Sequence, residues 1–356
     1  MAGEISHALD LSLAAVGVLA GTVFFSGLVV AKLGAARLTA RVGADTAVRA
    51  TCAAAVAGNL ILAVSPDFAG LAVGRLLAGI SLGLALVLGP VLARTAGGVT
   101  LVGIFGGSVT IGVAGALGVG GLLRASGADW RLDFVISAAL AAAALALIPR
   151  LADATIASGS VLAIARRALR ASPAWRLELV FTTALGIPYV LGVWLVPHLT
   201  EDVGLSAGIA GLLGVSMFAL TAFLRPEGAH LDREGRSLTV LGGLAPIAAA
   251  LGLVLLAFAD GAVVAVLAVV LAGVGFAIPY ASMYGEAERL YPGARIASVG
   301  LLSVGGNVLP LVATPVVGGA IEGGDGGLAL AALAVIPLLA GLLNLRPAAP
   351  RTTAAD

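Results

Sequence analysis

Charged residues and cysteine are both scarce in this sequence. Only 11% of the 356 residues are charged and 5% are aromatic, and the single cysteine, Cys52, excludes an intramolecular disulfide. A soluble chain of this size needs more charge than that on its surface. No phosphate-binding loop, Cys/His metal cluster or nucleophile elbow stands in a polar segment. No segment is a polar domain large enough to bind ATP. We therefore expect no enzyme, no metal and no cofactor.

Long hydrophobic runs take the place of charge. Hydrophobic residues make up 60% of the chain, and the mean hydropathy is +1.10. Runs of about 20 apolar residues match the ~30 Å hydrocarbon layer, and continuous runs favour helices over alternating barrel strands. The sequence therefore predicts an all-α multi-pass membrane protein with about 11 transmembrane helices. The predicted spans are 11–33, 46–64, 68–92, 98–123, 131–149, 177–198, 207–224, 237–258, 261–284, 295–320 and 327–345.

Lysine and arginine lie mainly on one side of these helices. If the segment after the first span is cytoplasmic and the sides alternate, only Arg75, Arg124 and Arg131 of the 20 lysines and arginines fall elsewhere. Basic residues are retained on the cytoplasmic side during insertion. We expect a protein of the plasma (cytoplasmic) membrane whose C-terminus is cytoplasmic and whose N-terminus is outside.

The longest polar connection divides the chain into two hydrophobic halves. We predict an N-terminal bundle of five spans at 1–150, a cytoplasmic linker at 151–176 and a C-terminal bundle of six spans at 177–356. The linker sequence "SVLAIARRALR" is compatible with a short amphipathic helix or with a plain basic linker. Similar glycine patterns recur in both halves, which makes the two bundles pseudo-symmetric. Paired halves with a solute site between them are a common transporter architecture.

Three motifs carry a resemblance to a known family. The segment "GAHLDREGR" fits a loop pattern G-x-x-x-D-R-x-G-R, and "ARLTARVGA" in the first half is a degraded copy that keeps Arg41 and Gly43. The segment "GRLLAG" places Arg75 inside a span. A third pattern, G-x8-G-x3-G-P-x2-G-G, is matched at its single glycines and its final pair, but Ala116 and Leu117 replace the Gly-Pro. The matching residues are Gly228, Asp232, Arg233, Gly235 and Arg236 of the loop, and Gly103, Gly112, Gly120 and Gly121 of the third pattern.

These motifs are similar to those of the major facilitator superfamily of transporters. The resemblance implies twelve helices, and the first span here corresponds to the second helix of the family. We therefore expect that the first helix is absent, either because the start codon was assigned too far downstream or because the protein has lost it. The resemblance also implies that the intact loop is a gating device and that Arg75 handles protons or substrate. The alternative for the loop is a solvated turn without a gating role, and the alternative for Arg75 is a structural arginine that only stabilises the packing of neighbouring helices.

Polar and aromatic side chains inside the spans mark a candidate substrate path. These residues are Asn59, Thr182, Tyr189, Tyr280, Tyr284, Asn307 and Thr314. Buried Asn and Thr also serve as interhelical hydrogen-bonding groups, which is the plainer interpretation. Arg75 is the only cation that the prediction places well inside a span. We therefore expect a small neutral, weakly anionic or amphipathic solute, and glycines of the fifth and eleventh helices that allow close helix packing.

Acidic residues leave the question of proton coupling open. No Asp or Glu lies near the centre of a predicted span, whereas proton coupling needs a titratable group that is alternately exposed. The alternatives are a group on the missing helix, Glu178 or Glu286 near the ends of their spans, or transport without a proton.

The resemblance implies secondary active transport by alternating access. Export is slightly favoured because part of the third pattern is typical of exporters. Uptake of a small organic solute is the alternative, and a transport-dead sensor or scaffold is a third. The expected partners are the lipid bilayer, a small-molecule substrate and, where coupling exists, a proton. We expect a monomer with no nucleic-acid partner.

Overall fold

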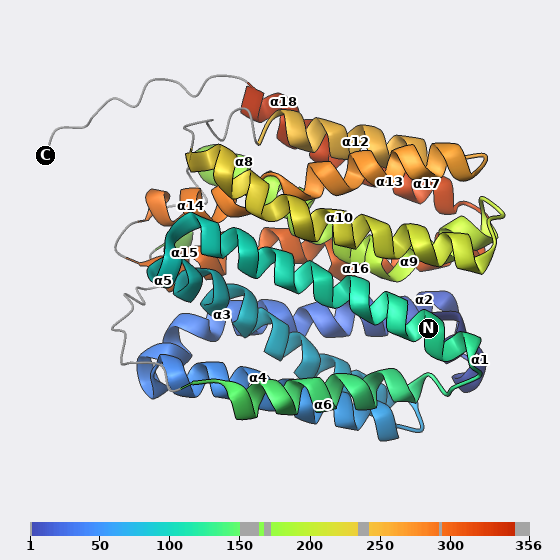
Figure 1. Cartoon of the computed structure of the whole chain (residues 1–356), viewed down its shortest axis with the longest axis horizontal. Helices are drawn as coiled ribbons and strands as arrows, with labels where there is room; N and C mark the ends of the chain where they lie inside the picture. The colour runs from blue at the N-terminus through green and yellow to red at the C-terminus, as the bar shows by residue number, and fades with distance from the viewer. Residues whose placement is uncertain (1, 150–163, 167–171, 234–241, 292–293, 346–356) are drawn as a thin grey trace, which may run out of the picture.

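A computed structural model describes residues 2–149, 164–166, 172–233, 242–291 and 294–345. All regular structure in these residues is helical. Within these ranges, eight helices are long and apolar enough to cross a membrane. The long helices run roughly alongside one another, with α4 and α6 on one side of the molecule and α12 and α13 on the other (Figure 1). The prediction of an all-α multi-pass membrane protein is confirmed.

The helices before residue 150 form one group. α2, η1 and α3 are continuous and form a single crossing from Leu13 to Val42. α5 has 58 residues, but Gly97 and Gly98 have non-helical backbone angles, so it consists of two crossing segments. The elements are α1 (Ala2–Leu9), α2 (Leu13–Gly17), η1 (Val18–Val23), α3 (Phe24–Val42), α4 (Ala44–Val64), α5 (Phe68–Ala125) and α6 (Arg131–Leu147).

The helices after residue 171 form the second group. Several crossings consist of two or three consecutive elements. A π-helical segment lies between the first and second α-helices of this part of the chain, and short turns at 278–279, 303–304 and 334 divide three further crossings. The elements are α8 (Ser172–Phe181), η2 (Thr182–Gly186), α9 (Ile187–Glu201), α10 (Ala207–Arg233), α12 (Leu244–Ala257), α13 (Ala262–Ala277), α14 (Tyr280–Leu290), α15 (Arg295–Leu302), α16 (Gly305–Glu322), α17 (Gly326–Leu333) and α18 (Val335–Leu345).

The order of these segments agrees with the eleven predicted spans, but α3 and α10 continue nine residues beyond their predicted ends. α3 continues to Val42 and α10 to Arg233, whereas the predicted spans end at 33 and 224. Hydropathy marks where an apolar run ends, and a helix continues beyond that point when its polar residues find partners. In the predicted linker, 151–176, the structure describes residues 164–166, which are helical, and residues 172–176, which form the start of α8.

Glycine permits close contacts between the N-terminal helices and the C-terminal helices. On α5, a Cβ at Gly103 would lie 2.9 Å from the carbonyl oxygen of Arg225, and one at Gly107 would lie 2.6 Å from that of Ala222, so α5 and α10 are in close contact. A Cβ at Gly17 would lie 2.7 Å from Cα of Pro315, so α2 is equally close to α16. These positions confirm close packing through glycine.

The same expectation is wrong for other glycines of α5. A Cβ at Gly112, Gly115 or Gly121 would meet no atom within 4 Å in the described part of the chain. These glycines therefore lie on faces of α5 that none of the described helices covers. The family pattern therefore overestimates how many of its glycines this chain uses for packing.

Candidate functional site

Arg225 is buried where α10 meets α5, and only 2% of it is exposed. Its Nη1 donates a hydrogen bond to the carbonyl oxygen of Gly106 (2.6 Å), and its Nη2 donates one to that of Ala184 (3.4 Å). The guanidinium carbon lies 3.9 Å from the centre of the Tyr280 ring. Because Gly106 has no side chain, the Tyr280 ring can lie directly against α5. Residues from both groups of helices therefore surround this cation.

Aromatic rings extend from Arg225 across several helices. Tyr280 and Tyr284 lie one turn apart on α14, with ring centres 5.1 Å apart, and Tyr284 meets Phe181 edge-on at 5.2 Å. Tyr189 meets Phe25 of α3 at 5.2 Å. Tyr189 and Tyr284 are also electrostatic neighbours of Arg225. We call this group the Arg225 cluster: Phe25, Phe181, Tyr189, Arg225, Tyr280 and Tyr284.

Three buried polar groups of the Arg225 cluster donate no hydrogen bond to any described residue. They are Nε of Arg225 and the hydroxyls of Tyr189 and Tyr280. The oxygen of the Tyr280 hydroxyl has the Tyr284 hydroxyl as its hydrogen-bonding neighbour. No described carboxylate acts on Arg225. A buried polar group without a partner costs about 1–3 kcal/mol, and an unpaired charge costs more. The cluster therefore holds an excess of hydrogen-bond donors and of positive charge.

A second buried cation lies on α3. Lys32 is 1% exposed, and its Nζ donates to the carbonyl oxygen (3.1 Å) and to Oγ (2.9 Å) of Ser303. Glu178 of α8 is an electrostatic neighbour of Lys32, and its carboxylate lies against the backbone N–H of Gly305. Its carboxylate fills the space in which Gly305 would carry a side chain. α3 and α8 thus each place a charged group between the two groups of helices.

An ion pair closes the predicted cytoplasmic side. Nε of Arg94 on α5 lies 3.1 Å from Oε2 of Glu288 on α14, and Nε of Arg295 lies 3.8 Å from the same oxygen. One turn deeper, the hydroxyl of Tyr284 donates to the carbonyl oxygen of Leu86 (3.5 Å). Both contacts join α5 to α14, so they must break if this side opens.

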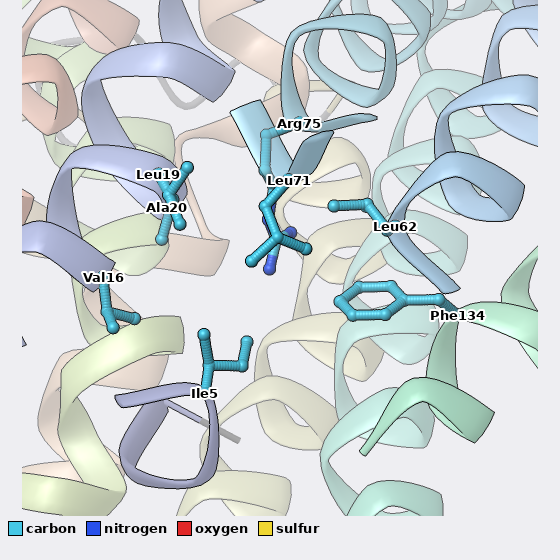
Figure 2. A pocket seen from close by; sticks show the side chains of 8 residues that line it. All are labelled: Ile5, Val16, Leu19, Ala20, Leu62, Leu71, Arg75 and Phe134. Atoms are coloured by element: carbon cyan, nitrogen blue, oxygen red, sulfur yellow. The ribbon is translucent and has the colours of Figure 1, made fainter. Parts of the chain in front are cut away.

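Arg75 has a different environment. It lies in a cavity lined by Ile5, Val16, Leu19, Ala20, Leu62, Leu71 and Phe134. Figure 2 shows its side chain among these apolar residues, near Phe134. Its guanidinium carbon lies 5.3 Å from the centre of the Phe134 ring. Every lining residue belongs to the N-terminal helices, so this cavity lies within one group of helices.

The predicted substrate path divides into two parts. Tyr189, Tyr280 and Tyr284 come together in the Arg225 cluster. Asn59 lies apart from them on α4, which packs against α5 and α6, and its amide donates to Ala55 of its own helix (2.8 Å).

The three remaining residues of that path lie on η2 and α16 of the C-terminal helices. Thr182 donates to the carbonyl oxygen of Glu178 (2.8 Å), and Asn307 donates to that of Ser303. Thr314 is buried against Gly21, and its Oγ1 has no partner in the described residues.

The predicted gating loop is only partly described. Gly228 lies in α10, where its missing side chain lets Ile278 approach. Asp232 and Arg233 belong to the last turn of α10, while Gly235 and Arg236 lie outside the described residues. In the first copy, Arg41 is exposed in the last turn of α3, and Gly43 joins α3 to α4 with a φ of +81°. A side chain is disfavoured at that φ, which explains why glycine survives there.

The sequence interpretation missed two cations and underestimated Glu178. The expectation that Arg75 is the only cation well inside a span is wrong, because Lys32 and Arg225 are both more deeply buried. Basic residues near the end of an apolar run are normally attributed to the inner surface, which concealed them. One signal was present: Lys32 and Arg225 precede the two copies of the loop by nearly the same number of residues.

Two groups of membrane helices with buried polar side chains between them define a secondary transporter. The family model of the Major Facilitator Superfamily matches residues 1–313. The chain therefore belongs to this family, whose members are transporters and not enzymes. No curated protein matches the chain significantly.

Solved structures of transporters share the fold. The crystal structure of a D-xylose–proton symporter has a TM-score of 0.74 at 15% identity, covering 96% of this chain and 91% of that one. The nucleoside transporter NupG has a TM-score of 0.68 at 17% identity, with coverages of 97% and 93%. The human organic anion transporter MFSD10 has a TM-score of 0.67 at 17% identity, with coverages of 92% and 83%. At these identities the likeness shows the fold alone.

Proposed function

We propose that this chain moves a small amphipathic organic solute by alternating access, with export as the favoured direction. In this proposal the helices of 1–150 and those of 177–356 form two bodies that rock against each other. The observation that carries the proposal is the position of the Arg225 cluster, because it has unsatisfied donors and receives residues from both bodies. A transport-dead scaffold gains nothing from unsatisfied buried groups, whereas a solute can satisfy them.

The direction of transport rests on the second segment of α5. Gly103 of the exporter-like pattern packs against α10 beside Arg225 and Pro226. Ala116 and Leu117 stand where exporters carry Gly-Pro, so the pattern supports export only in part. The similar solved structures belong to a sugar symporter, a nucleoside transporter and an organic anion transporter, and this variety shows that the fold does not select the cargo.

Glu178 is the best placed of the two acids that the sequence offers for proton coupling. Its buried carboxylate faces Lys32 between the two bodies. Glu286 instead pairs with Arg289 (3.1 Å), whose side chain is 54% exposed. A carboxylate whose counter-charge belongs to the other body changes its surroundings when the bodies move, as a coupling site requires. We therefore assign the coupling proton to Glu178.

Vesicle transport tests the proposed function. Purified protein is reconstituted with a panel of neutral, anionic and amphipathic compounds, and uptake and efflux are measured with imposed pH gradients. Wild type is compared with Arg75→Ala and Glu178→Gln, and Glu201→Gln serves as a control because Glu201 is exposed at the end of α9. We expect gradient-driven transport by wild type and Glu201→Gln, and transport by Glu178→Gln that no longer responds to the gradient.

The same experiment distinguishes the alternatives. Accumulation in the direction opposite to export would identify an uptake permease. If wild type transports every active compound at a rate that does not depend on the pH gradient, transport is not coupled to a proton. If correctly folded protein transports no compound of the panel, the sensor or scaffold replaces the transporter.

A further inference from the structure

The Arg225 cluster lacks an anion. Arg225 is buried, no described carboxylate acts on it, and its contacts are the carbonyl oxygens of Gly106 and Ala184 and the face of Tyr280. Carbonyl dipoles and a ring face stabilise a guanidinium less than an oxyanion bound to it would. Nε of Arg225 and the hydroxyls of Tyr189 and Tyr280 remain available as donors. Three donors beside one unpaired cation are complementary to an oxyanion.

The other buried cation near this contact is already balanced. Lys32 has Glu178 as its electrostatic partner and Ser303 as its hydrogen-bond acceptor. Phe25 lies seven residues before Lys32 on α3, and Phe181 lies three residues after Glu178 on α8. The charged pair is therefore about 5–10 Å along these helices from the aromatic rings. Arg225 is left with a single uncompensated positive charge, which matches a monovalent anion better than a phosphate with two negative charges.

The surroundings of the donors indicate what the anion is attached to. Phe25, Phe181 and Tyr284 contribute ring faces and edges to the same cluster and are buried. Rings of this kind pack against a flat apolar body. We propose that the cargo of this transporter is a monovalent organic carboxylate with an aromatic or flat apolar body, and that Arg225, assisted by the hydroxyls of Tyr189 and Tyr280, binds the carboxylate.

This inference rests on the proposed transport function, because the cluster is closed in this structure and cargo reaches it only when the two bodies separate. The carboxylate then replaces Gly106 as the acceptor for Arg225. Since Gly106 belongs to α5 and Arg225 to α10, the exchange removes one bond between the bodies. Binding of cargo and release of this contact are thus the same event.

Binding in lipid nanodiscs tests the proposal with carboxylates and their matched neutral amides. The carboxylates are phenylacetate, 4-phenylbutyrate and 1-naphthylacetate, each compared with its neutral amide, with phenethylamine as a cation and with nitrate as an inorganic anion. Dissociation constants are measured by calorimetry and by ligand-induced shifts of the unfolding temperature. We expect wild type to bind at least one carboxylate on the order of tenfold more tightly than its amide, and to prefer it to nitrate and phenethylamine.

Four variants locate this preference. Arg225→Gln should remove the difference between carboxylate and amide, Arg225→Lys should keep part of it, and Tyr280→Phe should weaken carboxylate binding severalfold. Arg37→Gln removes an exposed arginine of α3 and should leave the preference unchanged. If Arg225 has only a structural role, Arg225→Gln will lower the unfolding temperature of the ligand-free protein but keep the preference.

The outcomes separate this inference from the transport function. Wild type without a preference for any carboxylate over its amide, or with a preference for nitrate, overturns the carboxylate assignment and leaves transport of another solute intact. A preference that survives Arg225→Gln overturns the role of Arg225. Carboxylate binding that depends on Arg225 without movement across vesicles supports the site and refutes the proposed transport.

Discussion

Arg225 and Arg75 are both arginines within membrane helices, and each faces an aromatic ring, but their surroundings differ. Arg225 is buried between α5 and α10, with two carbonyl acceptors and a ring 3.9 Å away. Arg75 lies in an apolar cavity with Phe134 at 5.3 Å, and it makes no hydrogen bond to any described residue. The first arginine is held by dipoles from both groups of helices. The second is held within one group.

This difference indicates which cation responds to alternating access. Moving α10 away from α5 breaks the bond from Arg225 to Gly106 and changes its electrostatic surroundings. The cavity around Arg75 is lined only by N-terminal helices, so rocking of these helices as one body leaves its lining unchanged. The family resemblance directs attention to Arg75, whereas our proposal gives Arg225 the role of linking cargo to motion. That Arg75 handles protons or substrate stays a prediction.

The largest expected effect is a difference in the rate of carboxylate transport between Arg225→Gln and Arg75→Gln. Glutamine keeps hydrogen-bonding capacity but removes the charge in both. Because Arg225 would bind the cargo carboxylate directly, we expect its replacement to lower the initial rate of carboxylate transport by about ten- to a hundredfold. Arg75→Gln should lower the same rate by less than about threefold, since its cavity has no acceptor for a charged bond.

Initial rates at equal amounts of folded protein in vesicles provide the measurement, and Arg37→Gln controls for the loss of one positive charge. Equal losses for the two glutamine variants would show that the location between the groups of helices has no special importance. A larger loss for Arg75→Gln would return the leading role to the residue that the family motif indicates.

The second effect concerns the space that the Arg225 cluster requires. Gly106→Ala places a methyl group against the Tyr280 ring, whereas Gly112→Ala on the same helix meets no atom within 4 Å. Overpacking of this kind typically costs about 1–3 kcal/mol, so we expect a clearly lower unfolding temperature for Gly106→Ala. Gly112→Ala should be neutral or slightly stabilising, since alanine favours a helix more than glycine does. Thermal unfolding in detergent measures both, and equal temperatures would contradict the packing that surrounds Arg225.

The sequence predicted the fold well, because the segments that cross the membrane are recognised by their apolar composition. Apolar runs of membrane length set the number and order of the helices, and the spacing of Tyr280 and Tyr284 placed both rings on one face of a helix. Tyr189 lies on another helix, so residue spacing alone could not predict that it packs near Tyr280 and Tyr284. Asn59, by contrast, satisfies its amide within α4, and a list of polar residues inside spans cannot separate such a case from a ligand.

Lys32 and Arg225 escaped sequence interpretation because hydropathy and the positive-inside rule both move a basic residue out of the membrane. Each is buried by a specific partner in the other group of helices, namely Ser303 for Lys32 and Gly106 for Arg225. Such partners are far away in the sequence and can be found only after the helices are packed. Glu178 is a similar case, since its burial depends on Gly305 of another crossing.

The smallest expected effect is Tyr280→Phe, and it tests whether the unsatisfied hydroxyl in the cluster serves the ligand and not the fold. Phenylalanine keeps the ring beside Arg225 and removes a buried hydroxyl that donates to no described acceptor and has only the Tyr284 hydroxyl as a hydrogen-bonding neighbour. The free energy of unfolding should therefore stay within about 0.5 kcal/mol of wild type or rise slightly. Tyr284→Phe is the matched control, because it loses a hydrogen bond to Leu86 (3.5 Å) and should be the less stable variant. If Tyr280→Phe is clearly destabilising, its hydroxyl already donates to an acceptor in the ligand-free protein, and the excess of donors that distinguishes Arg225 from Arg75 is smaller than we infer.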